Sequence, residues 1–199
     1  MTIKPYSSLQ LIICYDIEIQ PFILGGAKER IRREASFYDK ERGRLVIDWF
    51  FQRPALMIQR FLKHLRWMEF YGERDPRYYY HYFFYRRLSY KLGYQIPANT
   101  VGEGLKLLHW GAIIINSKAR IGKNCTIFPG VTVGSTYKGV PVIGDNCHLG
   151  LGAKVFGNVR VGNNVQILAN AVVTKDVPDN CIVAGVPAKV IRMLNNQEN

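Results

Sequence analysis

The chain has 199 residues, of which 48% are apolar, and a formal net charge of +12. This composition argues against wholesale disorder and allows one domain, or two small ones, with a sizeable core. A strongly basic chain can bind nucleic acid, anionic lipid or a phosphorylated ligand. Because no nucleic-acid-binding motif is present, we rank the last two higher.

The first segment offers few clear signals. Residues 1–25 fit no single type of element, and they contain no recognisable signal peptide. The apolar stretch over residues 9–24 is interrupted by acidic residues and a proline, so it is too short and too polar to span a membrane. Residues 28–42 predict a charged, weakly amphipathic helix.

Two stronger helices follow. Residues 55–71 carry apolar side chains at helical spacing and come directly after Pro54, which suits the first turn of a helix. The Asp-Pro pair at 75–76 is typical of another helix start, and residues 78–92 continue it. Gly93 is the expected C-cap.

These helices are both aromatic and basic, which leaves two interpretations open. They can form a cap, or a contact between copies, that covers the exposed strand edges of the first coil of the domain that follows. Alternatively, they can lie on a membrane surface. We favour the cap, because buried aromatic side chains need no lipid.

A six-residue repeat occupies the second half of the chain. Large aliphatic residues recur at every sixth position, and the fourth residue after each is small or medium-sized. Glycine often follows the aliphatic residue and suits turns, because it tolerates positive φ. The aliphatic positions are Val101, Leu107, Ile115, Ile121, Ile127, Val133, Ile143, Leu149, Val155, Val161, Ile167 and Val173.

This period predicts a left-handed parallel β-helix. Three short strands make one triangular coil, so each aliphatic side chain points inward and stacks on the one three repeats later. A β-sandwich is excluded because it shows no fixed six-residue register. We therefore predict an α+β chain, with a mainly helical region over residues 1–95, a β-helix of about four coils over 96–191 and a tail over 192–199.

The register slips twice. Two extra residues enter between Leu107 and Ile115, and four enter between Val133 and Ile143. Insertions into a solenoid bulge outward, and such loops often bind ligand. We expect both to lie beside His109 and to contribute to one site, with plain surface loops as the alternative.

The cysteines indicate structural roles. Cys14, Cys125, Cys147 and Cys181 include no C-x-x-C pair, which argues against a zinc ribbon or a thioredoxin-like site. Three of them lie in the repeat, where small apolar side chains are needed inside the coils. We expect buried thiols in a reducing compartment.

The chain has four histidines. His64 is predicted to be a solvated residue on a helix face, and His81 a structural one. His148 directly precedes an inward aliphatic residue, so its side chain should point outward. His109 differs because it lies at the first slip, and a histidine is the natural general base for an acceptor hydroxyl near neutral pH.

Residues from about 85 to 191 resemble the hexapeptide-repeat acyltransferases, most of all the serine acetyltransferase branch. In that family a histidine at the place of His109 is the catalytic base, and acetyl-CoA and an alcohol bind together between two subunits of a trimer. The resemblance implies that the histidine takes the hydroxyl proton and that the oxygen attacks the thioester. The matching stretches are 90–97 (YKLGYQIP), 109–113 (HWGAI), 121–127 (IGKNCTI) and 184–191 (AGVPAKVI).

The resemblance also implies a site for acetyl-CoA along the coils near the C-terminal end, and it implies no metal. Backbone groups are expected to bind pantetheine, and basic side chains to bind the phosphates. It further implies a homotrimer, with pairing of trimers left open. The residues expected to bind CoA are Gly152, Ala153, Ala169 and Gly185 through the backbone, and Lys175 and Lys189 through their side chains.

The chain departs from the serine acetyltransferase pattern in three places. Leu108 stands where an Asp precedes the histidine. Residues 139–141 (GVP) stand where an Arg-His pair helps to hold the serine carboxylate. The carboxylate that orients the histidine is expected near Gln95, which is uncharged.

A serine acceptor therefore loses its charge partners, and we favour an uncharged hydroxyl, such as that of a sugar in surface or capsular polysaccharide biosynthesis. Trp110 could stack on a sugar ring, and Tyr137 and Lys138 in the second insertion are further candidates for binding the acceptor.

Three alternatives stay in view. The first is a serine O-acetyltransferase of cysteine biosynthesis. The second is a non-catalytic, membrane-associated scaffold. A metal enzyme of the carbonic-anhydrase type is disfavoured, because it needs three histidine ligands and only His109 and His148 lie in the coils. We expect a cytoplasmic location, with peripheral contact at the inner face of the membrane left open.

Overall fold

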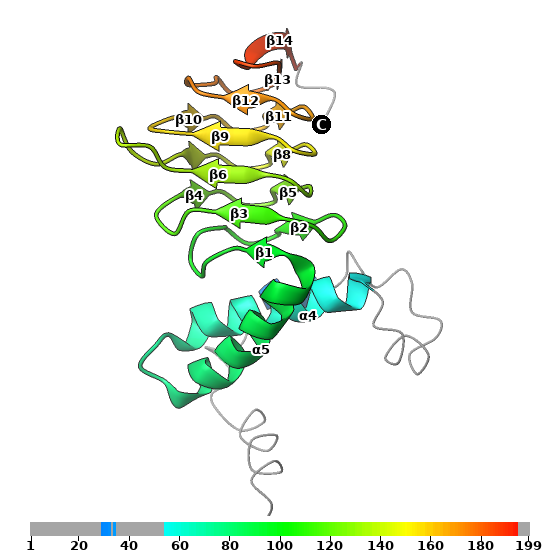
Figure 1. Cartoon of the computed structure of the whole chain (residues 1–199), viewed down its shortest axis with the longest axis vertical. Coiled ribbons are helices and arrows are strands. Elements are labelled where there is room, and N and C mark those ends of the chain that lie inside the picture. The colour runs from blue at the N-terminus through cyan, green and yellow to red at the C-terminus, as the bar shows by residue number, and fades with distance from the viewer. Residues whose placement is uncertain (1–28, 33, 35–53, 195–199) are drawn as a thin grey trace, which may run out of the picture.

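The computed structural model describes residues 29–32, 34 and 54–194 (Figure 1). Of the helix predicted over residues 28–42, the described residues 29–32 and 34 are helical. Residues 1–25 and the last five residues of the predicted tail lie outside the described part of the chain.

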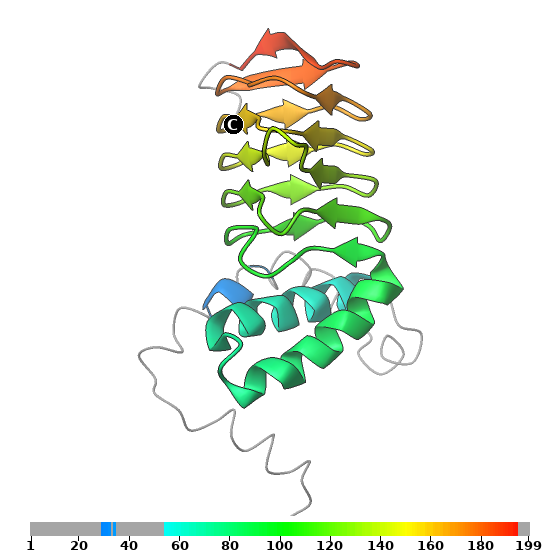
Figure 2. The same ribbon diagram turned by 60° about the vertical axis from the view of Figure 1, so that its left-hand side comes forward.

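Two helices form a hairpin below the first coil (Figures 1 and 2). The first is α4 (Pro54–Tyr71) and the second is α5 (Pro76–Leu92), as the sequence predicts, although α5 begins two residues before residue 78. Asp75 caps α5 by accepting a backbone N–H of its first turn at 2.9 Å. Gly93 ends α5 with φ of 77° and donates its N–H to Ser89 O at 2.9 Å.

Three sheets form the faces of a prism, and we name each face after its first strand. Apart from β14, which pairs antiparallel with β13, all of the strands are parallel. The β1 face contains β1 (Tyr94–Gln95), β3 (Ile113–Ile115), β6 (Thr132–Gly134), β9 (Lys154–Phe156) and β12 (Val172–Val173). The β2 face contains β2 (Lys106–Leu107), β5 (Thr126–Ile127), β8 (His148–Leu149), β11 (Gln166–Ile167), β13 (Cys181–Ala184) and β14 (Lys189–Met193). The β4 face contains β4 (Arg120–Ile121), β7 (Val142–Ile143) and β10 (Arg160–Val161).

The β-helix has five coils, against the about four predicted. Bridges from Val101 to Ile121 and from Val161 to Val177 extend the β4 face by one layer at each end. The sequence count was lower because it used only the regular aliphatic positions. The first strand carries Tyr94 at its inward position, and Val177 follows Val161 after a shortened coil.

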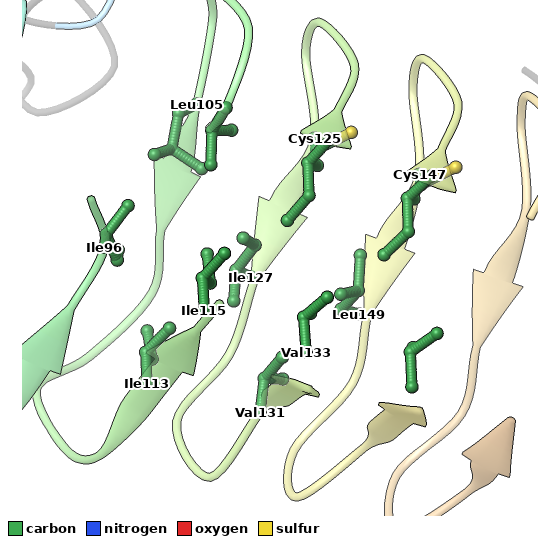
Figure 3. Close-up of a cluster of buried hydrophobic side chains, with 14 of the residues drawn as sticks. Ile96, Leu105, Ile113, Ile115, Cys125, Ile127, Val131, Val133, Cys147 and Leu149 are labelled. Carbon is green, nitrogen blue, oxygen red and sulfur yellow. The ribbon is translucent and has the colours of Figure 1, made fainter. Parts of the chain in front are cut away.

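The predicted core is confirmed. All twelve aliphatic positions are buried, with no more than 6% of any side chain exposed. Figure 3 shows Ile115, Ile127, Val133 and Leu149 stacked inside the prism. Cys125, Cys147 and Cys181 are also buried and free, as expected. Consecutive coils approach so closely that a Cβ on Gly122 would lie 2.6 Å from a backbone carbon of the next coil.

Arg66 of α4 closes the open edge of the first coil. Its guanidinium donates to Val101 O at 2.9 Å and to Gly102 O at 2.6 Å. Glu34 pairs with it at 2.9 Å and accepts the N–H of Leu105 at 3.2 Å. Burial raises the pKa of Glu34, although Arg66 opposes this. The helices therefore form the cap that the sequence favoured, because they satisfy backbone groups at the edge of the solenoid.

Replacing an inward residue should test this stacking. Ile167 is fully buried, so Ile167→Ala should lower the free energy of unfolding by about 2–5 kcal/mol. Its neighbour on the same strand, Gln166, is exposed, and Gln166→Ala should change the free energy by no more than about 0.5 kcal/mol. Urea unfolding measures both values, and equal losses would contradict the inward register.

Candidate functional site

The turns of the β-helix stack at corners, and two corners concern the site. The His109 corner joins the β2 face to the β1 face through residues 108–112, 128–131, 150–153 and 168–171, and it ends at 185–188. The loop corner joins the β1 face to the β4 face through residues 116–119, 135–141, 157–159 and 174–176.

His109 is exposed at the lowest turn of its corner, and Trp110 beside it is 60% exposed. The two-residue insertion widens this turn, because Leu107 pairs with Ile127 twenty positions later instead of eighteen. The backbone of His109 is left-handed, with φ of 63°. The corner therefore presents the imidazole and the indole outside the coil.

The widened turn is anchored to the helical cap. Gly111 donates its N–H to Leu92 O at 3.0 Å, and Ile113 donates to Gly93 O at 3.1 Å, so the C-terminal end of α5 holds the turn from below. The hydroxyl of Tyr94 donates to the carbonyl of His109 itself at 2.6 Å. Sequence reasoning missed Tyr94, although an aromatic residue in place of an inward aliphatic is a signal that could have found it.

The group that orients the imidazole is not found within the described residues. No carboxylate there forms a hydrogen bond with the His109 side chain. Leu108 is half-buried, and Gln95 lies exposed on β1, paired with Ile114. Both departures noted in the sequence thus leave the imidazole without a charged partner in the described part of one chain.

All four backbone groups expected to bind CoA lie above His109 on the same corner. Gly152 is held by its N–H to Pro129 O at 2.9 Å, and Gly185 accepts the N–H of Val172 at 3.0 Å. The N–H of Ala169 donates to no other described residue. The turns carrying Gly152, Ala169 and Gly185 form a continuous column that rises from His109.

The fourth backbone candidate, Ala153, does not fit. Its side chain is fully buried, its N–H donates to Gly150 O at 3.0 Å, and its carbonyl accepts the N–H of Thr132 at 3.0 Å. Ala153 is the small inward residue of its coil, and its polar groups are already used.

The two lysines expected to bind phosphate are separated. Lys189 begins β14 next to the His109 corner, where it pairs with Ala184. Lys175 lies on the loop corner instead. Sequence reasoning also missed Lys154, whose Nζ donates to Gly130 O at 3.3 Å and to Gly152 O at 3.4 Å and so brings a positive charge to the His109 corner.

The second insertion lies at the other corner, which corrects the expectation that both insertions lie beside His109. The turns around residues 109 and 137 project from opposite sides of the prism (Figure 1). Thr136 and Gly139 pair with each other at 2.9 and 3.1 Å and close the loop. Tyr137 is 94% exposed, and Lys138 is exposed beside it. The expectation was wrong because the chain passes to a new face of the prism about every six residues, so insertions in neighbouring coils can emerge at different corners.

The other histidines lie in packed surroundings. His64 was expected to be solvated, but its Nδ1 lies 2.9 Å from Nδ1 of His81, and burial, followed by His81, lowers the pKa of His64 to about 3. His81 is buried and structural, as predicted. His148 points outward from β8 and packs against Phe128 with 5.0 Å between ring centroids, and burial lowers its pKa. Within the described residues, no group of three potential metal ligands occurs.

Comparisons with known proteins agree on one kind of relative. No protein-family model matches the chain. The serine acetyltransferase of Synechococcus elongatus is 34% identical over 151 residues, which are 73% of this chain and 53% of that protein. The chain thus spans about half the length of this curated relative.

Solved structures give the same result over more of the chain. The serine acetyltransferase of Brucella abortus matches with a TM-score of 0.68 and 28% identity, covering 87% of this chain and 73% of that one. The structure of the Brucella abortus enzyme in complex with coenzyme A matches with a TM-score of 0.66 and 28% identity, covering 94% and 74%.

Proposed function

Because this chain belongs to the hexapeptide-repeat acyltransferases of the left-handed β-helix fold and is serine acetyltransferase-like, we propose that it transfers an acetyl group from acetyl-CoA to a hydroxyl. The observation that carries the proposal is the His109 corner. One exposed imidazole lies at the foot of a column of turns that offers the N–H of Ala169 and two nearby ammonium groups, those of Lys154 and Lys189.

The chemistry follows from this arrangement. Neutral His109 takes the proton of the acceptor hydroxyl, and the oxygen attacks the thioester carbonyl of acetyl-CoA. The intermediate then expels the CoA thiolate, which recovers the proton from the imidazolium. Lys154 and Lys189 would pair with phosphates of CoA as point charges, and backbone groups at Ala169 and Gly185 would bind its pantetheine arm.

Serine is the acceptor that we place first. The relatives and the solved structures named above are serine acetyltransferases, and none of them supports the polysaccharide acceptor that the sequence departures favoured. A serine carboxylate would need a cation, and Lys138 is the cation on the second insertion. A sugar hydroxyl stays second, because Leu108 and the short loop at 139–141 still lack the expected charged groups.

We also propose that the site is completed by a second copy of the chain. His109 and the pair Tyr137–Lys138 lie on different corners of one prism, so a single chain does not bring them together. In a cyclic trimer the loop corner of one copy can face the His109 corner of the next. Lys175, on the loop corner, would reach the CoA phosphates from the same direction.

The outer side of α5 supports a further proposal, peripheral contact with an anionic membrane at its inner face. Its exposed side chains include Tyr79, Phe83 and Tyr90, together with Arg86 and Arg87, and the helix contains no acidic residue. Aromatic and basic side chains together suit a headgroup layer. No helix in the described part of the chain is long and apolar enough to cross a bilayer.

Removing the base should stop the transfer. His109→Ala should lower kcat by about 10²–10⁴-fold, the usual effect of losing a general base, without changing the fold. Release of the CoA thiol measures turnover with L-serine, nucleotide sugars and oligosaccharides as separate acceptors. His148→Ala is the matched control and should keep wild-type turnover. Full activity in His109→Ala would refute the mechanism, and turnover with saccharides alone would make the sugar the acceptor.

Mixed trimers should test the shared site. His109→Ala and the double variant Tyr137→Ala/Lys138→Ala should each have low activity as pure trimers. Co-expressed in equal amounts, they should recover about a quarter of wild-type activity, because that fraction of interfaces pairs two intact halves. Activity no higher than the mean of the two pure variants would show that each site belongs to one chain.

Membrane contact should depend on the α5 arginines. Flotation with phosphatidylglycerol-containing vesicles should capture the wild-type protein at low salt, and Arg86→Gln/Arg87→Gln should reduce the bound fraction several-fold. Arg120→Gln/Arg160→Gln removes the same charge from the β4 face and should bind like the wild type. Equal loss in both variants would indicate attraction by net charge alone.

A further inference from the structure

The turn that carries His109 rests on the helical cap, and the carbonyl of His109 has a side-chain partner from the first strand. In the higher turns the N–H of each coil reaches the carbonyl of the coil below: Gly130 to Ala112 at 2.6 Å, Gly152 to Pro129 at 2.9 Å and Asn170 to Leu151 at 2.7 Å. At the lowest turn Gly111 continues this pattern, because its N–H donates to Leu92 O of the cap at 3.0 Å. The carbonyl of His109 accepts a side chain, the phenol of Tyr94.

The conformation of His109 also needs support. Its φ of 63° places it in the left-handed region, which costs free energy for a residue with a Cβ. Every other non-glycine residue with positive φ in the described part of the chain is asparagine, and asparagine and histidine are both enriched in this region among residues that carry a Cβ. Contacts that hold the backbone of His109 help to keep it in this conformation.

From these observations we propose that Tyr94 is a positioning residue for His109. Its hydroxyl lies 2.6 Å from the carbonyl of His109 and fixes the peptide plane that follows the Cα. Because that plane sets the direction of the Cα–Cβ bond, the contact aims the imidazole at the acceptor hydroxyl. The inference rests on the proposed function, in which His109 is the base.

Tyr94 is itself firmly held. It is 2% exposed, and its ring meets Phe61 of α4 edge-on with 5.2 Å between centroids. Its backbone carbonyl accepts the hydroxyl of Ser89 from α5. One helix of the cap therefore holds the ring of Tyr94 and the other holds its backbone, and the phenol links both helices to the carbonyl of His109.

The structure offers a closely matched control in Tyr85. Tyr85 is also buried, stacks on the same Phe61 at 5.2 Å, and donates its hydroxyl to a backbone carbonyl of the first coil, Ile96 O, at 2.7 Å. Tyr85→Phe and Tyr94→Phe remove the same atom from the same aromatic cluster. They differ in that Tyr94 alone reaches His109.

Tyr94→Phe should lower kcat by about 10–100-fold, with little change in KM for acetyl-CoA, because a misdirected base slows proton transfer more than binding. Tyr85→Phe should keep kcat within about twofold. Thermal unfolding should show similar losses in both variants, which separates positioning from stability. Equal kcat in the two variants would overturn the inference, whether both fall or neither does.

Two further measurements separate failure of this inference from failure of the proposed function. In the His109→Ala background, Tyr94→Phe should leave the residual rate unchanged, because it acts only through the imidazole. Nitrogen-15 NMR of the imidazoles should show altered His109 signals in Tyr94→Phe and unaltered ones in Tyr85→Phe, whatever the acceptor proves to be. Unchanged His109 signals in Tyr94→Phe would reject the positioning role even if His109 is the base.

Discussion

The hydrogen-bonded ladder between successive coils is the constraint on which the rest of the structure depends. The regular coils repeat after eighteen residues, so Ile115 meets Val133 and Leu149 meets Ile167. The last coil is shorter, and Ile167 meets Val183 after sixteen. Where residues are inserted, the sequence separation between paired residues increases. It is twenty residues for Leu107 with Ile127 and twenty-two for Ile127 with Leu149. The inward side chains keep their places, because the extra residues leave through a corner. A solenoid can thus change its surface chemistry at a turn without disturbing its core.

Structural features that depend only on nearby residues could be predicted from the sequence, because an insertion at a turn does not change which residues face inward. The aliphatic residue of each six-residue repeat faces inward whatever lies outside the coil, so the period alone identified the buried positions. The limits of α4 and α5 were likewise local, since Pro54, Asp75 and Gly93 act within one helical turn. Even the first insertion could be recognised as the place where His109 leaves the coil.

Features that depend on the direction of the chain in space could not be predicted in the same way. The second insertion belongs to the coil that follows the first, yet it emerges at another corner, because the chain turns between faces. His64 follows the spacing of an exposed helical residue, but its neighbour His81 comes from the other helix of the hairpin. The number of coils was underestimated because Tyr94 fills an inward position with an aromatic ring, which a search for aliphatic residues passes over.

The helical cap has to meet two demands at once, and they explain why a charged cluster is buried beneath an apolar prism. The end of a β-helix exposes carbonyls and N–H groups, which an apolar helix surface would leave unsatisfied at a cost in free energy. Arg66 meets this demand with a planar set of donors, and Glu34 and Glu69 then hold the guanidinium at 2.9 and 2.8 Å.

The helical cap must also hold the first coil in a fixed position, since the turn carrying His109 rests on the end of α5. Directional hydrogen bonds from Arg66 fix the lateral position of the coil, and the aromatic cluster around Phe61 fills the remaining volume. Polar contacts therefore set the register of cap and coil, whereas apolar packing supplies most of the attraction between them.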